Sequence, residues 1–511
     1  MKKPNVIWIC TDQQRADSLA CYGNPVCRSP NIDRIAATGV RFDQHHTPMQ
    51  ICSPSRATMA TGLLPRHHQL ITNGRALPEN VPTLMKLLSG NGYSTHGVGK
   101  QHLQPILADE ALQMPDSRSF WETRGARDWD GPFYGYDSID LLLGESDTAA
   151  VAGHYASWLE ENFPESASLL DPASAPEPPP EDLDEIWNCA LPFEQHYNYW
   201  ITERACRFLQ SSYDDDHPYF LFVSFPDPHH PFSPPAPYCD RFKPEDMPLP
   251  RFDPGERERM PDYLDALYPK GKGFRELYWS ADDSLEAGSM ITTDDISDHS
   301  MQRAIAATYG MIEMIDDCVG KILSEVEKQQ GLSEVLVVFT SDHGELLGTH
   351  GLLHKGPPSY RQLTQVSCLM SGPGIDCNRV VESPTNHIDL MPTLLVLCGI
   401  DATDVNLDGT DLSPVLSGHK TSIREFDFGE YHPTALPHLY NQTVRTAEWR
   451  LSVYPQRPQW GELFDLRSDP EEHVNLFNDP CYSQEKSELA TVLQTQFPPQ
   501  FDVENPRLCK W

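Results

Sequence analysis

Runs of apolar, β-branched and aromatic residues recur along the chain, and each has the length of a buried strand. The clearest runs are Val6–Cys10, Tyr219–Phe225 and Val335–Phe339. Apolar residues with helical spacing lie between them, over Val81–Leu88 and Met301–Val326. Strands that alternate with helices form largely parallel sheets that helices cover on both faces. We therefore predict an α/β fold with a large mixed, mostly parallel sheet sandwiched by helices.

The pattern changes after about residue 415, where the apolar runs become shorter. They resemble a strand meander, and the acidic segment Asp469–Glu472 has the composition of a helix start; the predicted short strands are Gln442–Val444, Trp449–Tyr454 and Glu462–Phe464. We predict a large domain over residues 1–415 and a smaller carboxy-terminal α+β domain over 416–496 with a short antiparallel sheet. Residues 497–511 are predicted to form an extended tail.

Two stretches of the large domain lack the strand and helix patterns. Residues 160–185 are acidic and rich in proline, and residues 240–300 are rich in proline and aspartate. Such composition is typical of surface loops rather than of a packed core. We expect long loop insertions near 105–200 and 240–300.

Charge and cysteine content restrict the function. Among 511 residues there are 39 Lys and Arg against 74 Asp and Glu, which gives a net charge of −35. Nucleic-acid binding requires a cationic face, so it is not expected. The 13 cysteines include no C-x-x-C pair, which argues against disulfide scaffolds and zinc ribbons. No apolar run is long enough to span a membrane, and the first one is too short for a secretory signal, so we expect a cytoplasmic protein.

Polar side chains follow each predicted strand directly. Asp12-Gln13 follows the first strand and Asp342-His343 the third, while His229 follows the second. A fourth segment, Gly92–Val98, leads into Lys100 and His102. Because parallel strands present their carboxyl ends at one edge, these side chains are expected to meet there. Asp12 and Asp342, with Gln13 and His343, are suited to bind a divalent cation. An aspartate after a strand also serves as an ordinary helix cap.

The segment Cys52-Ser-Pro-Ser-Arg56 has features of a helix start. Pro54 suits the first turn, and Gly62 suits the helix end. Cys52 would then lie at a helix N-terminus, where backbone N–H groups stabilise an anion. Two interpretations follow from the residues alone: a thiolate nucleophile, or a buried structural cysteine.

The motif around Cys52 resembles the signature of the type I sulfatases, which belong to the alkaline phosphatase superfamily. Further motifs occur in the family's order over nearly the whole chain, namely Asp12, Gly99–His102, Pro228-His229, Ser341–Glu345, Lys355 and, near the carboxyl end, Glu462–Leu466 with Asp469–Glu471. The resemblance implies an alkaline phosphatase-like fold and a sulfuric ester hydrolase. It also implies that Cys52 is oxidised to Cα-formylglycine by a maturation enzyme, which would be a partner of this chain.

The resemblance assigns a role to each matching residue. The hydrated aldehyde of residue 52 would bind the cation and attack sulfur, so Cys52 counts among the metal ligands. Arg56, Lys100 and Lys355 would neutralise charge on the sulfuryl oxygens and the nucleophile. His229 would be the leaving-group acid, and His102 would remove the proton that expels sulfate.

Two positions depart from the common family pattern. Gln13 and His343 stand where many sulfatases carry Asp and Asn, and they resemble the branch with choline sulfatases and phosphonate monoester hydrolases. Oxygen ligands favour Ca²⁺, which we expect first, whereas an imidazole shifts preference toward Mn²⁺. The leading substrate is a small aryl, alkyl or carbohydrate sulfate, and the alternative is a phosphodiester or phosphonate monoester.

A catalytically silent metal-binding homologue is the third interpretation. It explains poorly why Arg56, Lys100, His102, His229 and Lys355 are all present. The sequence identifies neither the sulfated alcohol nor the oligomeric state, although the tail from Phe497 is compatible with a homo-oligomer.

Overall fold

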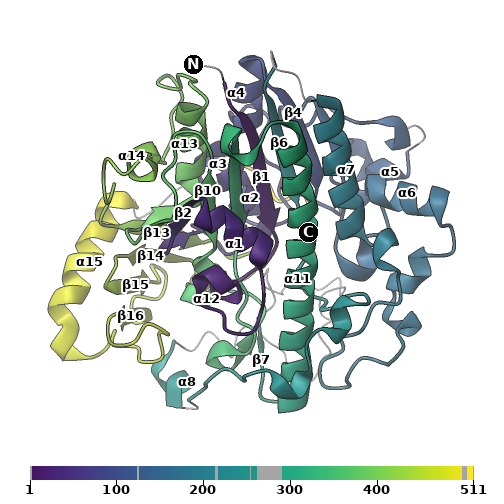
Figure 1. The fold of residues 1–511 in the computed structure, drawn as a ribbon. Coiled ribbons are helices and arrows are strands. Elements are labelled where there is room, and N and C mark those ends of the chain that lie inside the picture. Colours follow the sequence, from purple (N-terminus) through teal and green to yellow (C-terminus); the bar gives the residue numbers. More distant parts are fainter. Residues whose placement is uncertain are drawn as a thin grey trace.

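An eight-stranded sheet forms the centre of the computed structural model (Figure 1). The structure describes residues 3–123, 126–212, 217–253, 255–261, 290–497 and 503–509. From edge to edge the strands are β11 (Arg379–Val381), β2 (Gly39–Phe42), β10 (Cys368–Ser371), β8 (Val335–Ser341), β1 (Asn5–Thr11), β6 (Tyr219–Ser224), β4 (Ser94–Gly99) and β5 (Ser138–Leu141). Only β10 is antiparallel to its neighbours in this sheet. The predicted mixed, mostly parallel sheet is thus confirmed.

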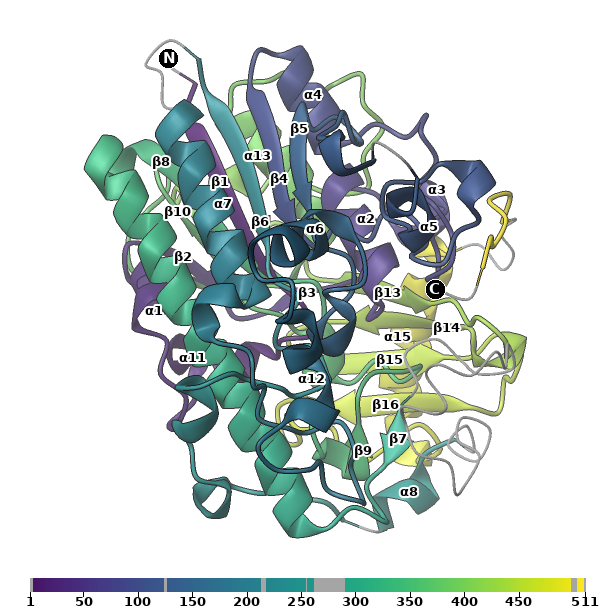
Figure 2. The same cartoon turned by 90° about the vertical axis from the view of Figure 1, so that its right-hand side faces the viewer.

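Helices cover both faces of this sheet, and the alternating side chains of β1 show why. Val6 and Trp8 pack on one face, with α2 (Cys52–Thr61), α4 (Leu84–Gly90) and α13 (Leu390–Leu397). Ile7 and Ile9 pack on the other face, with α7 (Tyr197–Ser212) and the long helix α11 (Asp298–Gln329). Helices α1 (Pro30–Ala37) and α6 (Gly153–Asn162) also join that second face. Figure 2 shows α7 and α11 running alongside the central strands.

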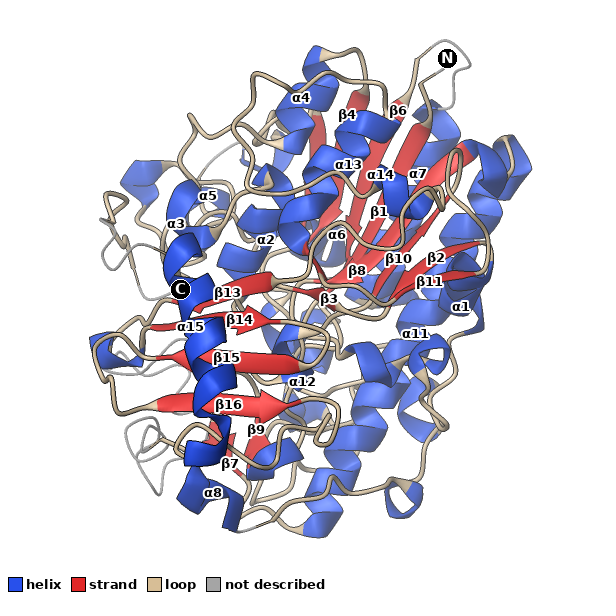
Figure 3. Ribbon diagram, turned by 90° about the vertical axis from the view of Figure 1, so that its left-hand side faces the viewer, coloured by secondary structure: helices blue, strands red, loops and turns tan. Residues whose placement is uncertain are grey.

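A second, antiparallel sheet lies in the carboxy-terminal part of the chain (Figure 3). Its strands are β13 (Asp427–Tyr431), β14 (Asn441–Arg445), β15 (Trp449–Val453) and β16 (Gly461–Asp465). Helix α15 (Ser483–Gln496) packs across it through Leu489 and Leu493. The predicted meander is confirmed, but the helix start expected at Asp469–Glu472 is wrong. That segment is a turn in which Glu472 has φ of 63° and its carboxylate accepts a bond from Arg450.

The predicted loop regions contain some regular structure. Residues 160–185 are mostly exposed and form two short 3-10 turns, and strand β5 with helix α6 lies within 105–200. The stretch 240–300 falls partly outside the described residues. The remaining short elements are α3 (Pro65–His68), α5 (Arg118–Trp121), α8 (Gly255–Arg259), α12 (Arg361–Thr364), α14 (Ser413–Leu416), β3 (His45–His46), β7 (Ile291–Thr292), β9 (Leu352–Leu353) and β12 (Thr385–Asn386). Within the described ranges, no helix combines the length and apolarity that crossing a bilayer requires.

Candidate active site

Strands β1 and β8 deliver the two predicted aspartates to the same place. The strands pair in parallel up to Thr11 and Ser341, so Asp12 and Asp342 leave the sheet side by side. Strand β4 reaches this edge next to β6, where the Lys100 amide donates to the Ser224 carbonyl at 3.2 Å. The predicted meeting of distant polar segments at the carboxyl edge is therefore present.

Cys52 is the first residue of α2 and is buried, with 2% of its surface exposed. The helix ends at Thr61, followed by Gly62 with φ of 65°, a conformation that glycine adopts without strain. The Sγ atom lies 3.2 Å from His343 Nε2 and 3.8 Å from Asp12 Oδ1. The helix thus holds residue 52 against both strand ends.

The surroundings of His343 are suited to a cation. Its Nδ1 donates to the Gly344 carbonyl at 3.0 Å, because a carbonyl only accepts, so the lone pair of a neutral ring lies on Nε2. That nitrogen faces the Oδ1 atoms of Asp12 at 3.8 Å and of Asp342 at 3.7 Å. Three electron-rich groups and the Cys52 sulfur converge within 4.8 Å of one another. A bound cation satisfies all of them, and the backbone carbonyl on Nδ1 orients the ring as in many metal sites.

Arg56 and Lys100 hold the carboxylates from the other side. Arg56 forms ion pairs with Asp342 at 2.9 Å and Asp12 at 3.1 Å. Lys100 Nζ lies 2.7 Å from Asp12 Oδ2 and 3.0 Å from Glu145 Oε2. Burial alone raises the pKa of Asp12, but Lys100 and other nearby cations hold this pKa well below its usual range. Asp12 is therefore ionised and available to a metal at neutral pH.

Lys355 is the third cation and contacts only neutral partners. Its Nζ donates to Gln13 Oε1 at 2.6 Å and lies 3.1 Å from Cys52 Sγ and 2.9 Å from His229 Nε2. Within the described part of the chain, no carboxylate forms an ion pair with it. Asp12 and Glu345 interact with this charge only at longer range, so the ammonium is suited to bind an anion from outside the protein directly.

The two predicted catalytic histidines are buried in the same site. Burial, with the Lys100 and Arg56 charges, lowers the pKa of His102 to about 3. Neither ring nitrogen of His102 has a hydrogen-bond partner among the described residues. Burial and the Lys355 ammonium hold the pKa of His229 well below its ordinary value. Both imidazoles are therefore neutral at pH 7 before an anion enters.

The structure brings all ten predicted site residues together, and it adds others. Glu145, which contacts Lys100 and lies 3.8 Å from His229 Nδ1, follows β5, a strand too short to stand out in the sequence. His230 Nδ1 lies 2.9 Å from Gln13 Nε2 and 3.0 Å from His354 Nδ1. Gln13 itself directs its amide oxygen to Lys355, and its amide nitrogen donates to Glu345.

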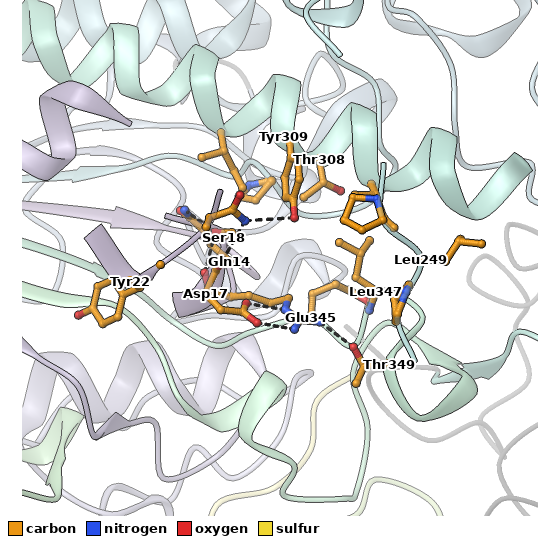
Figure 4. A pocket seen from close by; sticks show the side chains of 18 of the residues that line it. Gln14, Asp17, Ser18, Tyr22, Leu249, Thr308, Tyr309, Glu345, Leu347 and Thr349 are labelled. Carbon is orange, nitrogen blue, oxygen red and sulfur yellow. Dashed lines mark hydrogen bonds and ion pairs between the residues drawn. The ribbon is translucent and has the colours of Figure 1, made fainter. Parts of the chain in front are cut away.

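A cavity of about 430 Å³ adjoins this cluster at Gln13 and Glu345 (Figure 4). Leu249, Tyr309 and Leu347 are among the residues that line it. Its lining, drawn from the described residues, includes neither Cys52 nor the three cations. The cavity therefore borders the convergence of charged groups at Gln13 and does not enclose it.

The described geometry agrees with the comparison to known families. A model described as "Sulfatase" matches residues 4–400, and one described as "N-sulphoglucosamine sulphohydrolase, C-terminal" matches residues 348–497. The chain belongs to the sulfatase family. As a sulfatase it is a sulfuric ester hydrolase, and the resemblance noted from its motifs is confirmed.

Individual relatives are distant but match nearly full length. An arylsulfatase of Clostridium perfringens is 26% identical and covers 96% of this chain and 94% of its own. A choline-sulfatase of Rhizobium meliloti is 25% identical, covering 94% of this chain and 83% of its own. The crystal structure of a phosphonate monoester hydrolase of Agrobacterium radiobacter superposes with a TM-score of 0.77 at 25% identity, covering 97% and 96% of the two chains. This likeness supports the alkaline phosphatase-like fold.

Proposed function

We propose that this sulfatase hydrolyses a small sulfate monoester and that residue 52 acts as Cα-formylglycine. The observation that carries the proposal is the position of Cys52 Sγ, which lies 3.1 Å from Lys355 Nζ and 3.2 Å from His343 Nε2. The same surroundings would stabilise a thiolate, so the choice of the aldehyde rests also on membership of the sulfatase family. The hydrated aldehyde supplies one hydroxyl for attack on sulfur and a second hydroxyl for release of sulfate. A maturation enzyme that forms the aldehyde is part of the proposal.

The metal of this site is proposed to be held by Asp12, Asp342, His343 and residue 52, with Gln13 beside them. When bound, a divalent cation lowers the pKa of the nucleophilic hydroxyl and neutralises charge on the sulfuryl group. The carboxylate and amide oxygens favour Ca²⁺, and the imidazole makes Mn²⁺ the alternative.

The proposed histidine roles follow from their positions. His102 is neutral and its ring nitrogens are unpartnered among the described residues, so it is suited to accept the proton of the second hydroxyl. His229 has Lys355 on Nε2, and an incoming sulfate would offset that ammonium charge and favour protonation of His229. Protonated His229 then donates to the leaving oxygen.

Charge matching limits the substrate class. Among the groups joined by direct contacts, the carboxylates Asp12, Glu145 and Asp342 are balanced in number by the cations Arg56, Lys100 and Lys355, when the buried Glu345 on Gln13 is counted as neutral. A divalent cation leaves two positive charges, which match one ionised nucleophile and one monoanionic substrate. Sulfate monoesters carry one negative charge, but so do phosphodiesters and phosphonate monoesters. These remain the second candidate, supported by Gln13, His343 and the similarity to the phosphonate monoester hydrolase.

Paired kinetics test the choice of substrate. We expect a higher kcat/KM for an aryl sulfate than for an aryl phosphodiester, with Cys52→Ala inactive on both. A higher value for the diester would favour the second candidate. Absence of activity on both, with an unmodified thiol in co-expressed protein, would favour a silent homologue.

The domain division at 415 and 496, a cytoplasmic location and a homo-oligomeric state stay predictions. The described part of the tail supports contacts within one chain, because the Leu508 amide donates to the Gly74 carbonyl at 2.7 Å.

A further inference from the structure

A second cluster of metal-binding side chains lies outside the active site. Glu256, His350 and His473 offer one carboxylate oxygen and two imidazole nitrogens within 4.8 Å of one another. Glu256 and His350 are each 2% exposed, and the side chain of His473 is 28% exposed. We call these three residues the His473 cluster. None of them contacts a residue assigned above to the catalytic cation.

The neighbours of His350 place a hydrogen on one of its two ring nitrogens. Gln362 Nε2 donates to the Glu471 carboxylate at 3.1 Å, and a carboxylate only accepts, so Gln362 Oε1 is turned toward His350. That oxygen lies 3.2 Å from His350 Nε2, which therefore carries the hydrogen. A neutral His350 then has its lone pair on Nδ1.

This lone pair faces a carboxylate. His350 Nδ1 is in direct contact with Glu256 Oε1, and His473 Nδ1 lies 3.0 Å from the other oxygen of the same carboxylate. A lone pair against a carboxylate is repulsive unless a positive charge lies between them. That charge is either an extra proton on His350 or a metal ion. His343 in the active site has the same arrangement, with one nitrogen on an acceptor and the other facing carboxylates.

We propose that the His473 cluster binds Zn²⁺. Two imidazole nitrogens and one carboxylate are a common zinc ligand set, in which solvent takes the fourth position. The partly exposed His473 gives solvent access to that position. Gln362 acts as the outer partner that sets the ring orientation of His350, as such partners do in known metal sites.

The ion would join three segments that are distant in sequence. Glu256 lies on α8, His350 in the loop between β8 and β9, and His473 after β16; Figures 2 and 3 both show α8 beside β9 and β16. The His350 loop continues into β9 and then Lys355. The proposed Zn²⁺ would therefore connect the base of the loop that carries Lys355 to the segment that follows the carboxy-terminal sheet.

Zinc stoichiometry tests the proposal. Full-length protein is stripped with a chelator and titrated with Zn²⁺ by calorimetry, and Tm is measured with and without Zn²⁺. The wild type and the control His419→Ala, which removes an exposed histidine, should bind one more equivalent than His473→Ala. Zn²⁺ should raise Tm more in those two proteins than in His473→Ala. Zn²⁺ that binds at the active site adds the same number of equivalents in all three proteins. The difference in stoichiometry between them therefore reports the His473 cluster.

A second variant separates the metal from a proton. His473→Asp keeps a metal ligand but removes the hydrogen-bond donor, so it should retain the extra equivalent of Zn²⁺ with weaker affinity. Equal stoichiometry in wild type, His419→Ala and His473→Ala would overturn the proposal. Absence of the extra equivalent from the wild type itself would also overturn it and favour a protonated His350.

Discussion

Two buried clusters of charge in this molecule differ in how completely they are paired. In the carboxy-terminal sheet, Arg450 forms ion pairs with Glu472 at 2.6 Å and Glu462 at 2.8 Å, and Tyr454 donates to Glu462 at 2.7 Å. We call this set the Arg450 cluster. Around Cys52, by contrast, Lys355 contacts only an amide, a thiol and an imidazole. We expect the paired cluster to serve stability and the ammonium of Lys355 to serve anion binding.

Removing Lys355 gives the largest expected loss of function. Lys355→Met should lower kcat/KM for an aryl sulfate by about 10³-fold, because a fixed charge on the transition state is lost. The free energy of unfolding should change little, since no described carboxylate forms an ion pair with the charge that is removed. Lys328→Met, at a side chain that is 70% exposed, is the control and should change neither quantity. Retained activity in Lys355→Met would show that catalysis does not need this charge, and it would contradict the functional difference between the two clusters.

Removing Arg450 should have the opposite outcome. Arg450→Met leaves two buried carboxylates without their partner and should lower the free energy of unfolding by about 3–5 kcal/mol. The kcat of the remaining folded protein should be unchanged. Urea denaturation and active-site-normalised kinetics measure the two effects. Arg467→Met, whose side chain is 54% exposed, is the matched control. A drop in kcat without a change in stability would contradict the structural role.

A substitution of His229 tests its proposed role as the leaving-group acid. His229→Ala should slow sulfate esters with poor leaving groups by about 10²-fold and activated aryl esters much less, because only poor leaving groups need a proton. A series of esters that differ in leaving-group pKa measures this slope. Equal losses across the series would remove His229 from the role of leaving-group acid.

Buried histidines extend the comparison to acid stability. Burial lowers the pKa of His196 from 6.5 to about 3, so the folded state keeps it neutral while the unfolded state protonates below pH 6.5. The resulting stability is present above pH 6.5 and is lost as pH falls toward 3, by roughly 1.4 kcal/mol per pH unit. His196→Gln should lower the slope of the free energy of unfolding against pH between pH 3 and 6.5 by that amount. An unchanged slope would mean that His196 is protonated in the folded protein.

Local patterns made much of this architecture predictable. Continuous apolar runs identified β1, β6 and β8, and the polar residues after them identified Asp12, His229 and Asp342. The sequence did not predict Glu145, because β5 is a four-residue strand with polar residues at alternate positions. The His473 cluster joins residues 217 positions apart, so only the folded chain brings Glu256 to His473. The turn at Glu472 shows that a tertiary ion pair with Arg450 overrides a local helix signal.

The chemical state of residue 52 decides the central claim. Peptide mass spectrometry should be applied to catalytically active protein that was co-expressed with the maturation enzyme. The account predicts that the peptide carrying residue 52 contains an aldehyde, seen as its hydrate or as a hydrazone after derivatisation. An active preparation in which that peptide holds only unmodified cysteine would contradict the account.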